Sequence, residues 1–336
     1  MRKSVKRISI YNVFFFYYYI MVYSNKNYCS TSTNYQNGSC FKLEDLKIIA
    51  KELKIKNYVG YTHKKLWNKI KKILSECSTE VCWIKHPRLK KIFDKNIKFS
   101  NTNNKSLKHS IQFFRFKPIK PDEDGHNTWL STIDIEHLLN QLDKKYSDFK
   151  FIGAVPINFD DDIGKINDIT TNICVTNELC KLDINNLIKE GIRKIGIVFN
   201  MDPHYKGGSH WTSLFIEIND NNKNKKDKYA SVEYFDSFGL PPKTEIKNLI
   251  ERVSSDLKKE GYRIIHKLNK IKFQENNTEC GVYSIYTIRE RVMGCNYDNI
   301  IKKLKNIKIT NKNNPDNKMS SLRNVFFLPR EIYNTK

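Results

Sequence analysis

A glutamine and a cysteine six positions apart carry the clearest chemical signal in this 336-residue sequence. They lie in residues 273–283, which read FQENNTECGVY. Apolar residues then recur with helical spacing, so Cys280 is predicted at a helix N-terminus, where unpaired backbone N–H groups favour the reactive thiolate. Gln274 and the Cys280 N–H would donate to the oxygen of a tetrahedral intermediate. Gly281 would let a substrate carbonyl approach closely.

A histidine and an aspartate beside predicted strands supply the base and the acceptor that such a thiol needs. His210 precedes the β-rich run at 211–218, and Asp236 follows a similar run at 229–235. Adjacent strands would bring these two ends together. His210 is then expected to take the proton of Cys280, while Asp236 holds the imidazole in the required orientation.

Each of these four residues has a plainer interpretation when it is taken alone. A cysteine before glycine is usually a small buried residue, and a single histidine carries no stronger signal. An aspartate ahead of glycine and prolines is usually a turn former, and a lone glutamine is usually solvated. Their joint occurrence, in the chain order His, Asp, Gln, Cys, favours a catalytic constellation.

That order resembles the superfamily of SUMO-deconjugating proteases and the adenovirus protease. Within it, the chain most resembles the polyprotein-processing proteases of large cytoplasmic DNA viruses, of the African swine fever virus type, and residues 77–87, 237–239 and 319–326 support this. The resemblance covers roughly residues 125–330 and implies an α+β fold, a mixed central β-sheet flanked by helices. In some viral members the acceptor is Asn. Bacterial acetyltransferases of the same protease-like fold share the order His, acid, Cys.

The resemblance also implies a substrate site and an activity. Trp211 and Trp129, which opens residues 129–142, match tryptophans that cover a narrow tunnel for a Gly-Gly stretch in SUMO proteases. We therefore expect a cysteine endopeptidase without cofactors that cleaves polypeptides after Gly-Gly-type sites, processing viral structural polyproteins during virion maturation. One alternative is a deconjugase acting on SUMO or ubiquitin. Another, from a different class, is a nucleic-acid-binding virion protein with a structural protease fold.

The charge of the chain is concentrated at one end. Residues 1–120 hold 26 Lys or Arg against 6 Asp or Glu, a balance of +20 out of a total of +23. A proline-containing segment with an abrupt change of charge then reads as a linker. The expected organisation is a poorly defined segment, a basic helical domain (an arm or a SAP-like module), a linker and a catalytic domain, at residues 1–40, 41–117, 118–125 and 126–336.

The basic domain shows two amphipathic helices. Residues 43–53 and 62–74 have helical apolar spacing around a turn at 57–60, and Thr62 can cap the second helix. This pattern is similar to a SAP module, a small DNA-binding hairpin; the alternative is a helical arm that helps hold substrate. A polycation binds DNA or RNA non-specifically, and more weakly as salt rises. The lysines expected to contact nucleic acid or a partner are Lys64, Lys65, Lys69, Lys71 and Lys72.

The remaining cysteines and histidines predict no metal site. Cys77, Cys82 and His86 have short spacing, but a structural zinc site needs four ligands, and His109 is only the nearest candidate for the fourth. Eight cysteines are too sparse for a disulfide scaffold in a chain of this size. A nucleophilic thiol fits a reducing compartment, here the virion and host cytoplasm.

An aromatic-rich run at residues 11–23 follows a basic start. It is too short to span a bilayer, which takes about 20 apolar residues, and it lacks a small-residue cleavage site. Met21 within it is an alternative start of translation. No integral membrane association is therefore expected.

Overall fold

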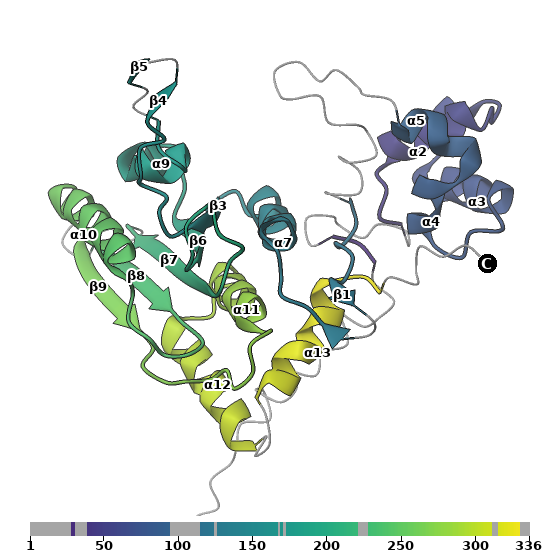
Figure 1. Cartoon of the computed structure of the whole chain (residues 1–336). Coiled ribbons are helices and arrows are strands. Elements are labelled where there is room, and N and C mark those ends of the chain that lie inside the picture. Colours follow the sequence, from purple (N-terminus) through teal and green to yellow (C-terminus); the bar gives the residue numbers. More distant parts are fainter. Residues whose placement is uncertain are drawn as a thin grey trace, which may run out of the picture. The chain divides into compact units, whose positions relative to one another are not determined.

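In the computed structural model the chain forms two units, one mainly helical and one built on a β-sheet (Figure 1). The helical unit contains the described residues up to 119 and from 324 onward, and the sheet unit contains the described residues of 120–323. The run at 11–23 and His109 lie outside the described residues, which are 28–30, 39–94, 115–123, 126–166, 169–170, 173–220, 228–310 and 315–329.

The helices of the helical unit pack around an apolar core. They are α2 (Leu43–Glu52), η1 (Tyr58–Gly60), α3 (His63–Ile73), α4 (Glu80–Lys85), η2 (Pro87–Leu89) and α5 (Lys90–Asp94). The two amphipathic helices and the turn between them are confirmed. The Thr62 hydroxyl accepts a hydrogen bond from the Lys65 N–H at 3.4 Å, as a capping residue does. Leu46 and Leu66 are fully buried where these helices meet the core.

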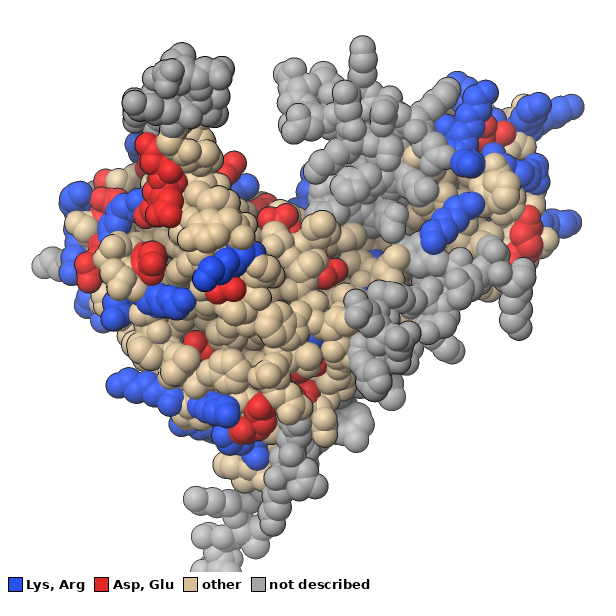
Figure 2. Space-filling model, viewed as in Figure 1, with Lys and Arg blue, Asp and Glu red and all other residues tan. Residues whose placement is uncertain are grey.

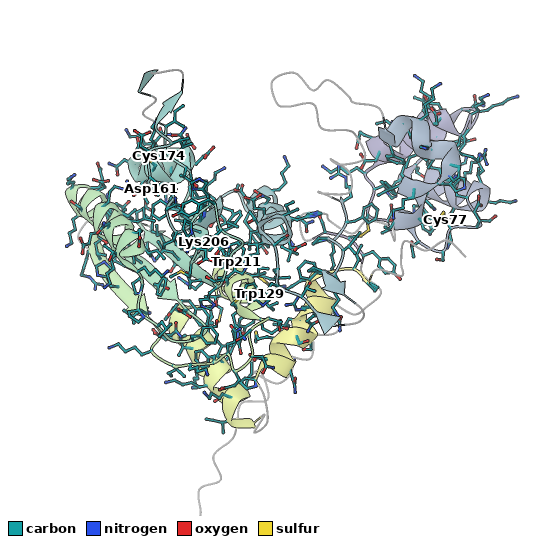
Figure 3. The ribbon with its side chains drawn as sticks, in the orientation of Figure 1. Cys77, Trp129, Asp161, Cys174, Lys206 and Trp211 are labelled. Atoms are coloured by element: carbon teal, nitrogen blue, oxygen red, sulfur yellow. A yellow bond between two sulfur atoms is a disulfide. The ribbon has the colours of Figure 1, made fainter. Side chains whose placement is uncertain are left out.

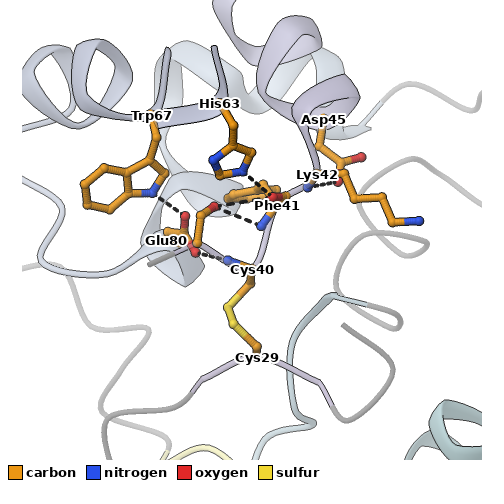
Figure 4. Close-up of a disulfide and its surroundings, with 9 residues drawn as sticks. Cys29, Cys40, Phe41, Lys42, Asp45, His63, Trp67 and Glu80 are labelled. Atoms are coloured by element: carbon orange, nitrogen blue, oxygen red, sulfur yellow. Dashed lines mark hydrogen bonds between the residues drawn. A yellow bond between two sulfur atoms is a disulfide. The ribbon is translucent and has the colours of Figure 1, made fainter. Parts of the chain in front are cut away.

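A buried carboxylate and a disulfide fix the chain segment that leads into this unit (Figure 4). Glu80 accepts hydrogen bonds from the Cys40 N–H at 2.7 Å and from the Trp67 indole N–H at 2.5 Å. Burial raises the pKa of Glu80 above its usual value, although these hydrogen bonds act in the opposite direction. Cys40 forms a disulfide with Cys29. The carboxylate therefore joins three separate stretches of chain.

The sheet unit is organised by a mixed five-stranded sheet in the order β3-β6-β7-β8-β9. The outer pairs β3–β6 and β8–β9 are parallel, and the inner pairs β6–β7 and β7–β8 are antiparallel. The strands of this sheet are β3 (Phe149–Pro156), β6 (Lys194–Asn200), β7 (Trp211–Asn219), β8 (Tyr229–Phe235) and β9 (Arg263–Leu268). Two short antiparallel ladders are β1 (Asp122–Glu123) with β2 (His126–Asn127) and β4 (Lys165–Ile166) with β5 (Ile169–Thr170).

Helices cover both faces of this sheet (Figure 1). Ile195 and Ile197 of β6 share an apolar cluster with Leu249 of α10. On the opposite face, a Cβ at Gly196 would lie 3.1 Å from Ile288 of α11. The helices of the unit are α7 (Thr132–Lys145), α8 (Asn177–Cys180), α9 (Ile184–Lys189), α10 (Thr244–Lys259), α11 (Cys280–Val292), α12 (Tyr297–Thr310) and α13 (Asp316–Phe326), whose last residues belong to the helical unit.

Six cysteines pair in disulfides, so the expectation that eight cysteines are too sparse for a disulfide scaffold is wrong. The pairs are separated by only 11, 5 and 6 residues, and they are Cys29–Cys40, Cys77–Cys82 and Cys174–Cys180. Their short spacing, rather than their number, was the relevant signal. Two of the zinc candidates are thus bonded to each other, and His86 pairs with Glu76. The described residues contain no group of side chains suited to a metal ion.

Among the described residues, no helix combines the length and apolar character needed to cross a membrane.

Candidate active site

The register of β7 and β8 places His210 beside Asp236. The strands are antiparallel, and Ser213 near the start of β7 faces Phe235 at the end of β8. Continued by one residue, this register sets Asp236 opposite Thr212, so His210, two residues before Thr212, is its diagonal neighbour on the same face. His210 Nε2 is 2.9 Å from Asp236 Oδ1, which is a hydrogen bond between an imidazole and a buried carboxylate.

Asp236 is held by contacts that the sequence did not reveal. Asn269 accepts a hydrogen bond from the Asp236 N–H at 3.0 Å and donates one to the Asp236 carbonyl at 2.7 Å. The Phe238 N–H donates to Asp236 Oδ1 at 2.7 Å, and the Phe238 ring stacks on His210 at 4.7 Å. Gly239 turns the chain at a φ of 73°, and a Cβ there would lie 2.7 Å from the Ile271 backbone. The carboxylate therefore has a fixed position and orientation.

Cys280, the predicted nucleophile, is the first residue of α11. Its side chain lies near enough to His210 to raise the pKa of the imidazole, whose Nε2 is hydrogen-bonded to Asp236. Burial lowers the pKa of His210, but the hydrogen bonds to Asp236 and Cys280 and their negative charge outweigh it and raise the pKa to about 9. His210 is thus protonated at neutral pH and can donate a proton.

The glycine after Cys280 serves packing rather than substrate access. A Cβ at Gly281 would lie 3.0 Å from the Leu130 side chain, which already fills that space. The expectation that Gly281 leaves room for a substrate carbonyl is therefore wrong. All of α11 is buried, so the helix start cannot shift without repacking its surroundings.

Gln274 is fully buried, and both ends of its amide are engaged. Its Oε1 accepts a hydrogen bond from the Ser237 hydroxyl at 2.6 Å, and its Nε2 donates to the Asn276 carbonyl at 2.5 Å. An amide nitrogen carries two hydrogens, so one remains available. Ser237, which immediately follows Asp236, thus fixes which way the amide points.

The two predicted substrate tryptophans have different environments (Figure 3). Trp129 has 44% of its surface exposed, whereas Trp211 is 5% exposed. The Trp211 indole N–H donates to the Leu130 carbonyl at 2.8 Å, so Trp211 fixes the segment that carries Trp129. The predicted helix start is displaced, because α7 begins at Thr132 after the Ser131 cap.

Comparisons with known proteins show which sequences are similar to this chain. The Ulp1 protease family, C-terminal catalytic domain, matches residues 194–323. A protein of Acanthamoeba polyphaga mimivirus that carries the name of a thiol protease is 33% identical over 222 residues, which span 66% of this chain and 63% of the relative. A cysteine protease of African swine fever virus is 25% identical over 226 residues, 67% of this chain and 77% of the relative.

A solved structure shows the fold as well. The crystal structure of the African swine fever virus protease has a TM-score of 0.54 and 23% identity, and the match covers 90% of this chain and 96% of that chain. The predicted α+β fold, with a mixed sheet flanked by helices and a mainly helical N-terminal region, is confirmed. The sheet unit is thus similar to the Ulp1 family of cysteine proteases, whose model matches residues 194–323.

Proposed function

We propose that this chain is a cysteine endopeptidase whose catalytic residues are His210, Asp236, Cys280 and Gln274. The observation that carries the proposal is the hydrogen bond between Asp236 and His210, together with the interaction of that imidazole with the Cys280 side chain. The thiol lies at the N-terminus of a 13-residue helix, and both partners come from the neighbouring ends of two paired strands. Thiolate, base and orienting acceptor are the three parts that nucleophilic catalysis by cysteine requires.

The first step forms a covalent acyl-enzyme. The Cys280 thiolate attacks the carbonyl carbon of the scissile peptide bond, and the carbonyl electrons move to oxygen. The free hydrogen of Gln274 Nε2 and the Cys280 N–H stabilise that oxyanion. When the intermediate collapses, the C–N bond breaks and His210 donates its proton to the leaving amine, which leaves a thioester on Cys280.

The second step releases the other product. Neutral His210 accepts a proton from water as the water oxygen attacks the thioester carbonyl. Collapse of this second intermediate breaks the C–S bond, releases the carboxylic acid and regenerates the imidazolium–thiolate pair. Asp236 keeps the ring oriented through both steps, because its own position is fixed by Asn269.

The preference for Gly-Gly sites is supported by Trp129 and its attachment. Trp129 exposes 44% of its surface, and the hydrogen bond from Trp211 to the next residue, Leu130, holds its segment in place. Because the next residue, Leu130, packs against the glycine that follows the nucleophile, a rigid indole on this segment would leave room for residues without side chains and exclude larger ones. Trp129 would be the wall of the substrate channel, and Trp211 its support.

The natural substrates we propose are viral structural polyproteins, cleaved during virion maturation in the virion or host cytoplasm. The viral sources of both relatives support this assignment. The alternative within the class is a deconjugase, since the family description refers to the Ulp1 protease and one name given to the African swine fever virus relative includes SUMO-1. The two differ in the substrate they need: a short Gly-Gly peptide suffices for the first, whereas the second requires a folded modifier.

The proposal is tested with fluorogenic peptides. Wild-type protein should cleave a Gly-Gly-Xaa peptide, an Ala-Phe peptide should be cleaved far more slowly, and Cys280→Ala should abolish turnover. Cys295→Ala is the matched control, because Cys295 is the other free cysteine among the described residues. Equal loss in both variants, or turnover that persists in Cys280→Ala, would refute the assignment. Cleavage of a SUMO fusion without cleavage of the peptide would favour the deconjugase.

A second function is proposed for the helical unit: non-specific binding of DNA or RNA. The observation that favours it is that α3 exposes a row of lysines and carries no acidic residue. Lys65 and Lys69 lie over the Tyr61 ring at 4.3 and 4.9 Å, so their stems are held on one side of the helix. The row comprises Lys64, Lys65, Lys69, Lys71 and Lys72.

A further inference from the structure

Helix α13 carries two buried charged residues on one face, and both contact the segments that present the proposed catalytic groups. Asp316 and Arg323 are 2% and 0% exposed. Seven residues correspond to nearly two turns, so the two side chains project from the same side of the helix. Met319, also buried, lies between them on that face. Neither residue takes part in the chemistry described above.

We propose that Asp316 and Arg323 are positioning residues that set the distance between the Gln274 amide and the Cys280 sulfur. This inference rests on the proposed function and assigns to α13 a part in its oxyanion hole. Asp316 holds the loop that carries Gln274, while Arg323 holds the residue immediately before Cys280. One rigid helix thus fixes both sides of the site.

The Asp316 contacts fall on the loop directly after Gln274. Asp316 Oδ2 accepts hydrogen bonds from the Glu275 N–H at 3.0 Å and the Asn276 N–H at 2.6 Å. Because Gln274 Nε2 donates to the carbonyl of Asn276, the same carboxylate fixes the group against which the catalytic amide is oriented. Asp316 Oδ1 also lies 3.2 Å from the Tyr283 hydroxyl, and Tyr283 belongs to the Cys280 helix.

The Arg323 contacts fall on the residue that caps α11. Arg323 Nε donates to Glu279 Oε2 at 2.9 Å, and Nη2 donates to the Thr278 carbonyl at 2.8 Å. Glu279 is 2% exposed, so a buried carboxylate lies next to the nucleophile and must be neutralised there. Asn127 also donates to Glu279 Oε1 at 3.1 Å and contacts Ser320 of α13. The segment leading to Trp129 is therefore tied to the same carboxylate.

These contacts predict a specific kinetic signature. A displaced Gln274 amide stabilises the transition state less well, whereas substrate binding and the reactivity of the thiol do not change. Asp316→Ala should therefore lower kcat about 10- to 100-fold with KM within about threefold. Binding of a peptide aldehyde, whose hemithioacetal oxygen occupies the oxyanion hole, should weaken by the same factor. The rate at which iodoacetamide alkylates Cys280 should stay within about twofold of wild type, because alkylation needs no oxyanion hole. Asp316→Asn keeps an acceptor oxygen and should recover most of kcat.

The matched control is a second buried arginine. Arg291, 2% exposed, pairs with Glu233 at 2.6 Å near the other end of α11, roughly 16 Å from Cys280 along the helix. Arg323→Lys should lower kcat and the affinity for the aldehyde, while the rate of alkylation stays near that of wild type. Arg291→Lys should lower the melting temperature, and any change in kcat should be matched by an equal change in the rate of alkylation. This arginine pair keeps the test decisive if Asp316→Ala does not fold.

Two results would overturn the inference. One is a folded Asp316→Ala protein with kcat and aldehyde affinity within twofold of wild type. The other is parallel loss of kcat and alkylation in both arginine variants, which would indicate general destabilisation. A wild-type protein that cleaves no peptide would instead refute the proposed function, so the two failures are distinguishable.

Discussion

The two units of the molecule differ in where they place their polar groups. In the sheet unit, buried polar side chains gather around the proposed site, and Asp236, Gln274 and Glu279 are each at most 2% exposed. In the helical unit the core cluster is apolar and the α3 lysines are exposed, although Asp45, Glu80, His86 and Lys117 are buried. Figure 2 shows Lys and Arg dominating the visible face of the helical unit, whereas both signs are interspersed on the sheet unit.

This difference shows how a site can be separated from a scaffold. A buried polar group without a partner costs about 1–3 kcal/mol, so each one present must be matched by specific contacts. Around Cys280 these contacts form a connected set that fixes orientation, which is what catalysis needs. In the helical unit the buried Glu80 also has specific contacts, but these only hold separate stretches of the chain together. Substitutions in the two units should therefore separate into effects on turnover and effects on stability.

Among substitutions that leave the Cys280 thiol in place, the largest effect is expected at Gln274. Gln274→Ala removes one donor to the oxyanion and should lower kcat by about 10²- to 10³-fold, equivalent to about 2.7–4 kcal/mol, with a small change in KM. Steady-state kinetics on a Gly-Gly peptide measures it. Ser237→Ala, which leaves the amide in place but removes the hydrogen bond that orients it, should cost less. A Gln274→Ala protein with kcat within threefold of wild type would show that this amide is structural.

The next effect is expected in the helical unit and on stability alone. Glu80→Ala leaves the Trp67 and Cys40 N–H groups without their acceptor and should lower the free energy of unfolding of this unit by about 1–3 kcal/mol. Hydrogen exchange of α2 and α3 reports it. Glu44→Ala, at an exposed position of α2, should stay within about 0.5 kcal/mol. A parallel fall in peptide kcat would contradict the expectation that substitutions in the helical unit affect stability but not turnover.

The chemical groups could be predicted from the sequence because each lies in a local pattern. His210 and Asp236 flank alternating strand residues, and Cys280 opens a helical period. The residues that hold these groups in place could not be predicted, since their partners are distant in sequence. Asn269 lies 33 residues from Asp236, and Glu279 lies 44 residues from its arginine. No short pattern encodes such pairings.

The same distinction explains the errors at Gly281 and the disulfides. A glycine after a nucleophile fits both substrate access and close packing, and only the position of Leu130 decides between them. Likewise, a count of cysteines carries no information on which side chains approach each other. Spacing does, and pairs separated by 5 or 6 residues can meet within a single turn of chain.

A smaller effect, on pH dependence, tests the role of Asp236. The pKa of His210 is raised to about 9, so the imidazole is protonated below that pH and neutral above it. Wild-type kcat/KM should therefore fall as pH rises through about 9. In Asp236→Asn the hydrogen bond to a charged acceptor and the negative charge are lost, so the pKa of His210 falls.

The alkaline limb of kcat/KM should then move to lower pH by about one unit or more. A profile from pH 6 to 10 measures it, with Asp256→Asn of α10 as the control, because Asp256 pairs only with Lys259 in the contacts described for its side chain. The direction also applies to stability: a raised histidine pKa stabilises the fold below pH 6.5, and this contribution is lost as pH rises to about 9. If the alkaline limb of kcat/KM is unchanged in Asp236→Asn, a group other than His210 controls that limb.

The smallest effect on catalysis is expected from the lysine row on α3, and it sharpens the comparison most directly. Replacing all five lysines by Gln removes exposed charge without touching the apolar side of the helix, where Leu66 and Ile70 are buried. Affinity for a short duplex DNA should fall, and the salt dependence of binding should flatten by roughly one unit of slope per lysine that contacts a phosphate. Peptide kcat should remain within twofold, because no reacting group is altered. DNA binding with an unchanged salt slope would remove α3 as the contact surface, whereas a large loss of kcat would place these lysines in the peptidase site instead.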